Sequence, residues 1–401
     1  MTRPIASPPG VLRAATLAGL CLALALPPVA GAPASEPTDA RGAGAESAAQ
    51  AAPALQVTTV QAGLELPWDL SFLPNGAMLY TERDRRQVVL RAPNGTRRVV
   101  VDAPAHVWSS DETGMMAVLV EPDFATRRTF LTCHGSTAGG SPDVRVVRWK
   151  LNAERNRARL VRNVVTGLPA SSGRHGGCRL RFGDEGALYI GTGDAADERH
   201  AQSLTSGGGK VLRVRPITGA GWPTNRWSGS SNAMKRRIFT YGHRNVQGLA
   251  LRADGRMWAV EHGTYRDDEA NLLRNGGNYG WQAGPGYDES RPMTDHSLPG
   301  VQINARWRSG TPTIAPSGAT WLRGSGWGSW QGALALAVLG SEELLILKFD
   351  SSGQLVRTFK PAVLNGDAGR LRSAVLGPGN NLLLTTSNGE DDRILRVSPR
   401  G

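Results

Sequence analysis

The chain has 401 residues with 50 glycines, 25 prolines and a hydrophobic content of 40%, so it can bury a substantial core. This richness in glycine and proline excludes a protein built from long helices and favours many short strands joined by turns. The formal net charge is +12, but the arginines are scattered, and the chain has no long basic run, zinc-finger spacing or RNA-binding aromatic motif. We therefore expect no nucleic acid partner.

The N-terminus has the pattern of a secretory signal. Arg3 and Arg13 give a positive start, residues 14–29 are apolar, and the small residues 30–32 offer a cleavage site. The apolar run is short for a membrane span. We predict a signal peptide over 1–32, a flexible linker over 33–54 and a folded domain over 55–401. The mature protein is expected in the periplasm or secreted, with no membrane span after cleavage.

Two cysteines, Cys133 and Cys178, remain after that cleavage. An even pair in an oxidising compartment predicts one disulfide, since only one pairing is possible. The alternative is two buried thiols. Cys178 directly precedes the first strand of a repeated unit, so a disulfide would join adjacent repeats.

A sequence unit recurs along the folded part. Each copy has a short apolar strand, a turn with Asp-Gly, Glu-Gly or Asn-Gly, and a second apolar strand, which is hairpin chemistry. The copies begin near Trp68, Met115, Leu180, Gly248, Ser317 and Arg372. Blades of this length cannot bury both faces alone and must stack around a channel. We predict an all-β, six-bladed β-propeller with four-stranded antiparallel blades around a central channel.

The loops that lead into propeller blades converge at one end of the channel, and His175 lies in such a loop before the third blade. Glycines flank it, so we expect it to be exposed to the channel and to serve as a general base. A hydrogen-bonded structural histidine is the alternative. The fourth blade opens with Arg244, Asn245 and Gln247, which are poor core formers and good donors to a ligand. A loop network that caps the channel is the alternative there.

Two further polar segments suggest binding. Residues 261–271 and 276–281 combine carboxylates with glycine-rich loops, which suits a hard cation such as calcium, although a solvated turn would also have this composition. Arg370 and Arg372 open the last blade, and positions i and i+2 of a strand share a face. Both guanidinium groups could therefore bind a carboxylate in the channel, unless they are surface arginines.

The order of these motifs resembles the soluble aldose (glucose/sorbosone) dehydrogenase family, which uses pyrroloquinoline quinone (PQQ). The motifs are His-Gly-Gly-x-Arg-Leu, Tyr-Gly-His-Arg-Asn-x-Gln-Gly-Leu, Glu-His-Gly followed by Gly-Asn-Tyr-Gly-Trp, Pro-Ser-Gly, and Arg-x-Arg. The resemblance covers nearly all of the chain from about residue 57. It implies an oxidoreductase that oxidises aldose sugars at C1 to lactones and passes hydride to PQQ, with Ca2+ as a second cofactor. The natural electron acceptor is not indicated.

The resemblance also assigns residues to roles. It implies His175 as the catalytic base, with Arg244 and Asn245 on the reacting oxygens of the quinone and Gln247 in the same motif. It implies Arg370 and Arg372 near the carboxylates of the cofactor. Gly263 and Thr264 match positions whose carbonyls hold the calcium under the cofactor, and Glu269 and Tyr279 match a second, structural calcium site.

Three positions depart from the family pattern. Gly340 stands where a lysine commonly contacts the quinone, Glu112 where a glutamine often lines the pocket, and Arg174 where some members have an acidic sugar contact. We expect the substitution Gly340→Lys to strengthen PQQ binding. Two other functions stay open: a non-catalytic propeller that binds carbohydrate, and a calcium-dependent lactone hydrolase.

Overall fold

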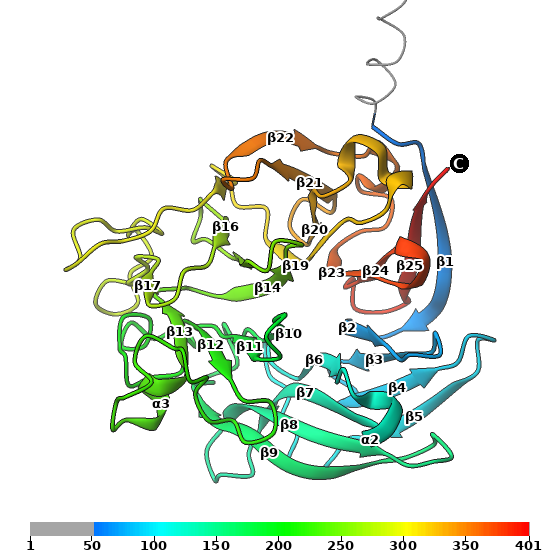
Figure 1. Ribbon diagram of the computed structural model, residues 1–401, viewed down its shortest axis with the longest axis horizontal. Coiled ribbons are helices and arrows are strands. Elements are labelled where there is room, and N and C mark those ends of the chain that lie inside the picture. Colours follow the sequence, from blue (N-terminus) through cyan, green and yellow to red (C-terminus); the bar gives the residue numbers. More distant parts are fainter. Residues whose placement is uncertain (1–51, 401) are drawn as a thin grey trace, which may run out of the picture. The chain divides into compact units, whose positions relative to one another are not determined.

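A computed structural model describes residues 52–400, which form six β-sheets arranged as blades around a central axis (Figure 1). This confirms the predicted six-bladed β-propeller. Every inner strand begins within two residues of a repeat start read from the sequence. The predicted signal peptide, and the linker as far as residue 51, lie outside the described residues.

The blades follow one another along the chain. Blade 1 has β2 (Pro67–Phe72), β3 (Met78–Glu82), β4 (Gln87–Arg91) and β5 (Arg97–Val101). Blade 2 has β6 (Met115–Val120), β7 (Thr129–Ser136), β8 (Asp143–Leu151) and β9 (Ala158–Leu168). Blade 3 has β10 (Arg179–Phe182), β11 (Leu188–Gly191), β12 (Lys210–Val214) and β13 (Ile238–Tyr241). Blade 4 has β14 (Val246–Leu251), β15 (Met257–Glu261), β16 (Glu269–Leu272) and β18 (Trp307–Arg308).

The last two blades complete the ring. Blade 5 has β19 (Pro316–Trp321), β20 (Leu334–Val338), β21 (Leu344–Phe349) and β22 (Leu355–Phe359). Blade 6 has β23 (Leu371–Leu376), β24 (Leu382–Thr386), β25 (Asp392–Pro399) and, as its outer strand, β1 (Leu55–Leu64). Blade 3 departs from the four-stranded pattern, because the short strand β17 (Gly277–Asn278) adds to its outer edge in parallel with β13.

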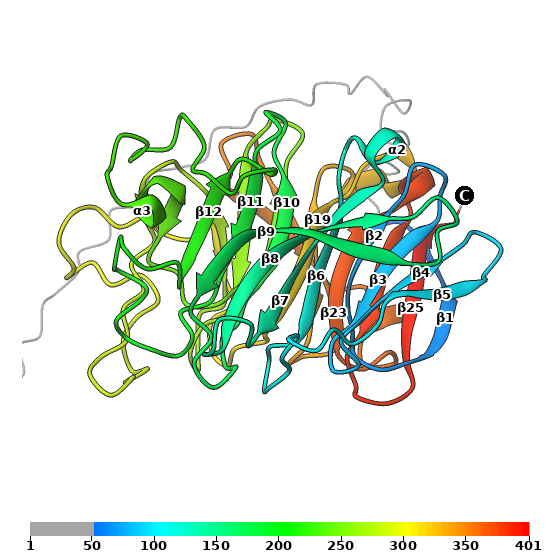
Figure 2. The same ribbon diagram turned by 90° about the horizontal axis from the view of Figure 1, so that it is seen from below.

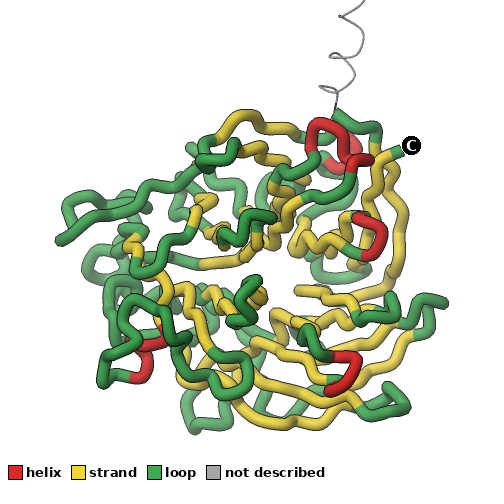
Figure 3. The backbone as a smooth tube through the Cα atoms, viewed as in Figure 1, coloured by secondary structure: helices red, strands yellow, loops and turns green. Residues whose placement is uncertain are grey.

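In the described part of the chain, helical structure is confined to short turns between strands, as the tube view shows (Figure 3). These are α2 (Phe124–Arg127), α3 (Ala233–Arg237), η1 (Ser325–Trp330), η2 (Ala362–Leu364) and η3 (Pro378–Asn380). None of the helices in residues 52–400 has the length and apolar character needed to cross a bilayer.

The first and last strands of the described chain close the ring of blades. Strand β1 pairs antiparallel with β25, with Leu55 opposite Pro399 and Val57 opposite Val397. Figure 2 shows β1 and β25 side by side. Because strands from opposite ends of the folded part share one blade, the ring cannot open without breaking this ladder of hydrogen bonds.

Apolar side chains fill the spaces between blades. Between blades 4 and 5, the Trp258 ring lies 5.4 Å from that of Trp321 and 4.6 Å from that of Phe349, measured between centroids. Aromatic pairs of this kind contribute about 0.5–1.5 kcal/mol beyond the area they bury. Each sheet is therefore held on both faces, as the repeat pattern predicts.

Blades 2 and 3 are also joined covalently. Cys133 in β7 and Cys178, directly before β10, form a disulfide with their Cα atoms 6.2 Å apart, which confirms the predicted pairing. The bond anchors the loop that carries His175, because that residue lies only a few positions before Cys178.

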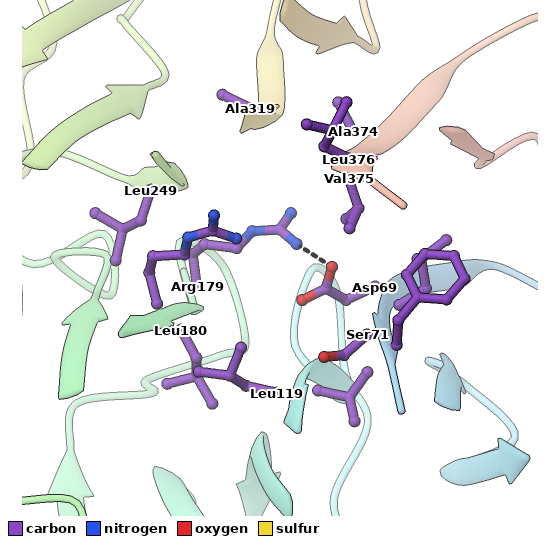
Figure 4. Close-up of a pocket in the computed structure, with 14 residues that line it drawn as sticks. Asp69, Ser71, Leu119, Arg179, Leu180, Leu249, Ala319, Ala374, Val375 and Leu376 are labelled. Carbon is purple, nitrogen blue, oxygen red and sulfur yellow. Dashed lines mark ion pairs between the residues drawn. The ribbon is translucent and has the colours of Figure 1, made fainter. Parts of the chain in front are cut away.

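The inner strands of all six blades line a cavity of about 160 Å³ in the channel (Figure 4). Most of its lining is apolar, but Asp69 of blade 1 and Arg179 of blade 3 form an ion pair of 2.7 Å in it. Ser373 Oγ donates to the Asp69 carboxylate at 2.8 Å and accepts from Arg179 at 2.9 Å. This buried cluster lies below the loops that open blades 3, 4 and 6.

Candidate functional site

The loops before blades 3 and 4 meet at one end of the channel. Gly193, just after β11, forms an isolated antiparallel bridge with Asn245. The N–H of the next residue, Asp194, donates to the carbonyl of Arg244 at 2.8 Å. The backbone itself therefore fixes the second hairpin of blade 3 against the start of blade 4.

His175 lies in this region but is not exposed as expected. Only 3% of its surface is accessible, so the expectation of an open histidine is wrong for this conformation. A hairpin after Trp281 contributes to this burial: its Tyr287 has the hydroxyl 3.0 Å from His175 Nδ1, and the two rings are tilted by 58° with their centroids 5.9 Å apart.

The His175 ring is held by a carboxylate that the sequence analysis did not single out. Nδ1 lies 2.8 Å from Asp194 Oδ1. The other carboxylate oxygen accepts from Trp281 Nε1 at 2.7 Å and from the Tyr287 hydroxyl at 2.8 Å. Burial opposes ionisation of Asp194, but its hydrogen bonds, chiefly that with His175, lower its pKa. Asp194 is therefore an ionised acceptor.

An ionised partner at Nδ1 decides the tautomer of His175. The ring proton sits on Nδ1, facing Asp194, and the lone pair sits on Nε2. Nε2 makes no hydrogen bond to any of residues 52–400. The arrangement leaves one ring nitrogen able to accept a proton from a ligand.

The polar residues of three blades form one hydrogen-bonded chain. Arg372 Nη1 donates to Gln247 Oε1 at 2.9 Å, and Gln247 Nε2 donates to Asn245 Oδ1 at 3.1 Å. Asn245 Nδ2 then donates to Glu112 Oε2 at 3.0 Å. Three of the predicted cofactor residues are thus brought together, and the Glu112 carboxylate is engaged by an amide instead of facing the site unpaired.

Arg372 is a buried cation without an acidic partner. It is 8% exposed, forms no ion pair within residues 52–400, and its Nε has no hydrogen-bond acceptor there. Burial, and then repulsion from Arg83, lower its pKa to about 9. A buried guanidinium in this state needs an anion. The site therefore fits a ligand that carries carboxylates, as PQQ does.

Arg370 is placed differently from Arg372. It precedes β23 and is exposed, while Arg372 is buried, and the β23–β24 ladder shifts register between Leu371 and Ser373. The positive charge of Arg370 nevertheless contributes to the lowered pKa of Arg372. Its assignment to a cofactor carboxylate stays a prediction.

Arg244 pairs with one carboxylate and also donates from Nη1 to the His262 carbonyl at 3.5 Å. Its Nε donates to Glu289 Oε1 at 3.1 Å, Nη2 contacts the same oxygen, and the residue is 5% exposed. Glu289, like Asp194 and Tyr287, was missed from the sequence. No local pattern distinguishes it from the neighbouring acidic residue of the same loop.

The predicted cofactor-calcium position is a tight loop with free oxygens. The carbonyls of Gly263 and Thr264 accept no hydrogen bond from residues 52–400, and Thr264 Oγ1 is buried without a partner. Asp268 holds the loop through the N–H groups of Gly263 at 2.9 Å and Ile314 at 2.6 Å. Unbonded carbonyl and hydroxyl oxygens are suitable ligands for calcium, so these residues fit the ion.

The second predicted calcium position has a buried carboxylate. Burial, and then the charge of Glu261, raise the pKa of Glu269 to about 8, and the Asn271 amide bridges the two acids. The Tyr279 hydroxyl is not free, because it donates to the Leu272 carbonyl at 2.6 Å. Only the carbonyl oxygen of Tyr279 remains as a ligand.

Neither calcium position is a cluster of acidic side chains. Across residues 52–400, no group of three or more His, Cys, Asp or Glu side chains could hold a metal ion. The two predicted ions would therefore depend largely on backbone oxygens. This is why their positions could be inferred only from the family resemblance.

Gly340 does not admit the lysine that we proposed there. A Cβ at this position would lie 2.7 Å from the carbonyl oxygen of Ile314, and the Gly340 N–H is bonded to that same oxygen at 2.8 Å. Any side chain would have to move backbone. The structure therefore gives no room for the lysine in this backbone conformation, and the effect of Gly340→Lys on PQQ binding stays a prediction.

The fold and site define a six-bladed β-propeller with a polar ligand site at one end of its channel. The model of the glucose/sorbosone dehydrogenase family matches residues 64–396, and the chain belongs to this family. It is similar to the aldose sugar dehydrogenase YliI of Escherichia coli (strain K12), with 29% identity over 365 residues, which cover 88% of this chain and 96% of that one.

Solved structures give the same result. The PQQ-bound form of aldose sugar dehydrogenase from Streptomyces coelicolor matches with a TM-score of 0.73 and 29% identity, over 87% of this chain and 100% of that one. The apo-form of the soluble aldose sugar dehydrogenase from Escherichia coli matches with a TM-score of 0.77 and 26% identity, over 86% of this chain and 100% of that one.

Proposed function

We propose that the protein is an exported oxidoreductase that oxidises an aldose sugar at C1 to the lactone, with PQQ as hydride acceptor and Ca2+ as its companion ion. The observation that carries this proposal is the buried His175–Asp194 pair with an unbonded Nε2, beside the arginines that open blades 4 and 6. Membership of the glucose/sorbosone dehydrogenase family supports the same reading.

His175 would act as the general base. Asp194 keeps the proton on Nδ1, so Nε2 accepts the proton of the anomeric hydroxyl, and Asp194 stabilises the imidazolium that results. PQQ, when bound, supplies the acceptor for the hydride from C1. One proton and one hydride leave the sugar, and C1 becomes the carbonyl of the lactone. Tyr287 and Trp281 hold Asp194 in place and exclude water from it.

The arginines and amides would hold the cofactor. Arg372 has the free charge to bind a carboxylate, and Arg370 stands at the solvent side of the same strand start. Asn245 and Gln247 would offer hydrogen bonds to the cofactor, and Arg244 would bring positive charge to one of its oxygens. The carbonyls of Gly263 and Thr264 would bind the calcium.

The test is to add PQQ and Ca2+ to purified apo-protein and to follow dye reduction with a panel of aldoses. We expect reduction that depends on sugar, is lost with a chelator, and weakens as salt screens the arginines. A direct titration of PQQ in excess calcium is the second measurement. Absence of binding would favour the non-catalytic carbohydrate-binding propeller, and hydrolysis of a lactone without quinone would favour the calcium-dependent hydrolase.

A further inference from the structure

The segment after Trp281 is a hairpin attached to the site by two side chains. Two backbone hydrogen bonds close its turn: the Gly284 N–H donates to the Asp288 carbonyl at 2.8 Å, and the Asp288 N–H donates to the Gly284 carbonyl at 3.1 Å. Within residues 52–400, the hydrogen bonds that join residues 284–292 to the rest of the chain come from Tyr287 and Glu289. In the chain this segment lies between β17 and β18.

Glu289 is bound by arginines from two blades. Arg174 Nη2 donates to both of its carboxylate oxygens, at 3.1 and 2.9 Å. Arg244 Nε donates to Oε1 at 3.1 Å, and Arg244 Nη2 contacts the same oxygen. One carboxylate thus accepts charge-assisted hydrogen bonds from both guanidinium groups, as a carboxylate ligand could.

These two arginines depend on Glu289 for charge balance. Neither forms another ion pair within the described residues. The Arg244 side chain is 6% exposed, so it would be a nearly buried, unpaired cation if Glu289 left. Burial disfavours the charged form of Glu289, but the hydrogen bonds from Arg244 and Arg174 outweigh this and lower its pKa, so it is ionised at neutral pH.

We propose that Arg174 and Arg244 form a carboxylate-binding clamp that Glu289 fills in the absence of ligand, and that a ligand carboxylate enters by displacing Glu289. Departure of Glu289 removes one of the two side-chain attachments of the hairpin that covers His175 and leaves that of Tyr287, so ligand binding loosens the cover of the site. The identification of the ligand as PQQ rests on the proposed function, but the clamp itself does not. A sugar acid carries the same group and is the alternative source of the carboxylate.

The variant Glu289→Gln tests the clamp, because it keeps the size of the side chain and removes the competing charge. PQQ with Ca2+, and separately glucuronate, are titrated calorimetrically into wild type, Glu289→Gln and the control Asp288→Asn. Asp288 is a neighbouring exposed carboxylate that bonds only to Ser290, so its variant should behave as wild type. In wild type, Glu289 occupies the clamp, so only the fraction of molecules with an empty clamp can bind and the apparent affinity is reduced by that fraction. Glu289→Gln weakens this competition and should bind the carboxylate ligand roughly tenfold more tightly.

Hydrogen exchange of residues 283–292 gives an independent readout. Exchange should speed up in Glu289→Gln, and in wild type when the ligand is added. Adding Arg174→Met to Glu289→Gln should remove the gain in affinity, because half of the clamp is lost.

The outcomes separate the two proposals. Tighter binding of PQQ identifies the cofactor as the source of the carboxylate. Tighter binding of glucuronate, with no PQQ binding by any variant, supports the clamp while the proposed dehydrogenase function fails. If Glu289→Gln binds both compounds no better than wild type, the clamp is overturned and Glu289 is only a structural partner of the two arginines.

Discussion

Two histidine–carboxylate pairs lie in the loops before blades 3 and 4. They differ in whether the second ring nitrogen of the histidine, Nε2, has a hydrogen-bond partner. His175 Nδ1 is 2.8 Å from Asp194, and His243 Nδ1 is 2.7 Å from Glu261, and both pairs are buried. His243 Nε2 has a second partner, Thr240 Oγ1, at 2.9 Å. The Nε2 of His175 has none among residues 52–400.

This difference separates a base from a structural group. A histidine bonded at both nitrogens spans two elements of structure and has no lone pair left for a ligand. A histidine bonded at Nδ1 alone has its tautomer set and its basic nitrogen free. Both residues sit beside arginine and glycine in the sequence, so only the second contact distinguishes them.

The largest effect is expected for His175→Ala. Loss of the general base should lower turnover by about 10²- to 10⁴-fold. The free energy of unfolding should fall by less than in His243→Ala, because Trp281 and the Tyr287 hydroxyl still donate to the buried Asp194 carboxylate. Steady-state dye reduction and the unfolding temperature are the two measurements, and unchanged turnover would remove His175 from the mechanism.

His243→Ala should show the reverse pattern. It leaves the buried Glu261 carboxylate short of a partner, which should cost about 3 kcal/mol in the free energy of unfolding. Turnover per folded molecule should fall far less than in His175→Ala. Denaturant titration and active-site counting measure both quantities. A loss of turnover as large as that of His175→Ala would erase the distinction between the two pairs.

Asp194→Asn sharpens the comparison from the carboxylate side. The amide keeps the shape but no longer fixes the proton on Nδ1 or stabilises the imidazolium, so turnover should fall by about 10²-fold or more. The affinity for PQQ should stay close to that of the wild type, because Asp194 contacts His175 and is not one of the residues expected to bind the cofactor. An unchanged rate would show that the tautomer is set by other contacts.

A third buried histidine, His134, gives the smallest effect at neutral pH and a pH dependence below it. Burial, and then Arg145, lower its pKa from the ordinary 6.5 to about 3. Between these values the unfolded chain binds the extra proton, so this residue makes stability fall as pH decreases, by about 1.4 kcal/mol per pH unit.

His134→Gln should remove that part of the acid sensitivity. Denaturant unfolding at pH 7, 6, 5 and 4 gives the slope for each protein, and the variant should have the shallower one. Parallel slopes would mean that His134 is protonated in the folded state.

The propeller could be predicted because each of its strands and turns is specified by residues close together in the sequence. Alternating apolar residues and the Asp-Gly type turns specify a strand and hairpin wherever they occur, and their recurrence counts the blades. The disulfide also followed from the sequence, since two cysteines allow a single pairing. Local information also sufficed to group Arg244, Asn245 and Gln247, because these residues lie within one short segment at the start of blade 4.

The contacts that give the site its chemistry were decided only by tertiary structure. His175 precedes the β10–β11 hairpin and Asp194 follows it, so the fold of the hairpin brings them together. Tyr287 and Glu289 belong to a segment more than 100 residues after His175. Nothing near Asp194 or Glu289 in the sequence distinguishes them from the other acidic residues of the chain. Closure of the ring brings the ends of different blades within hydrogen-bond distance. Burial there makes each unpaired charge costly, and this is why the side chains pair as they do.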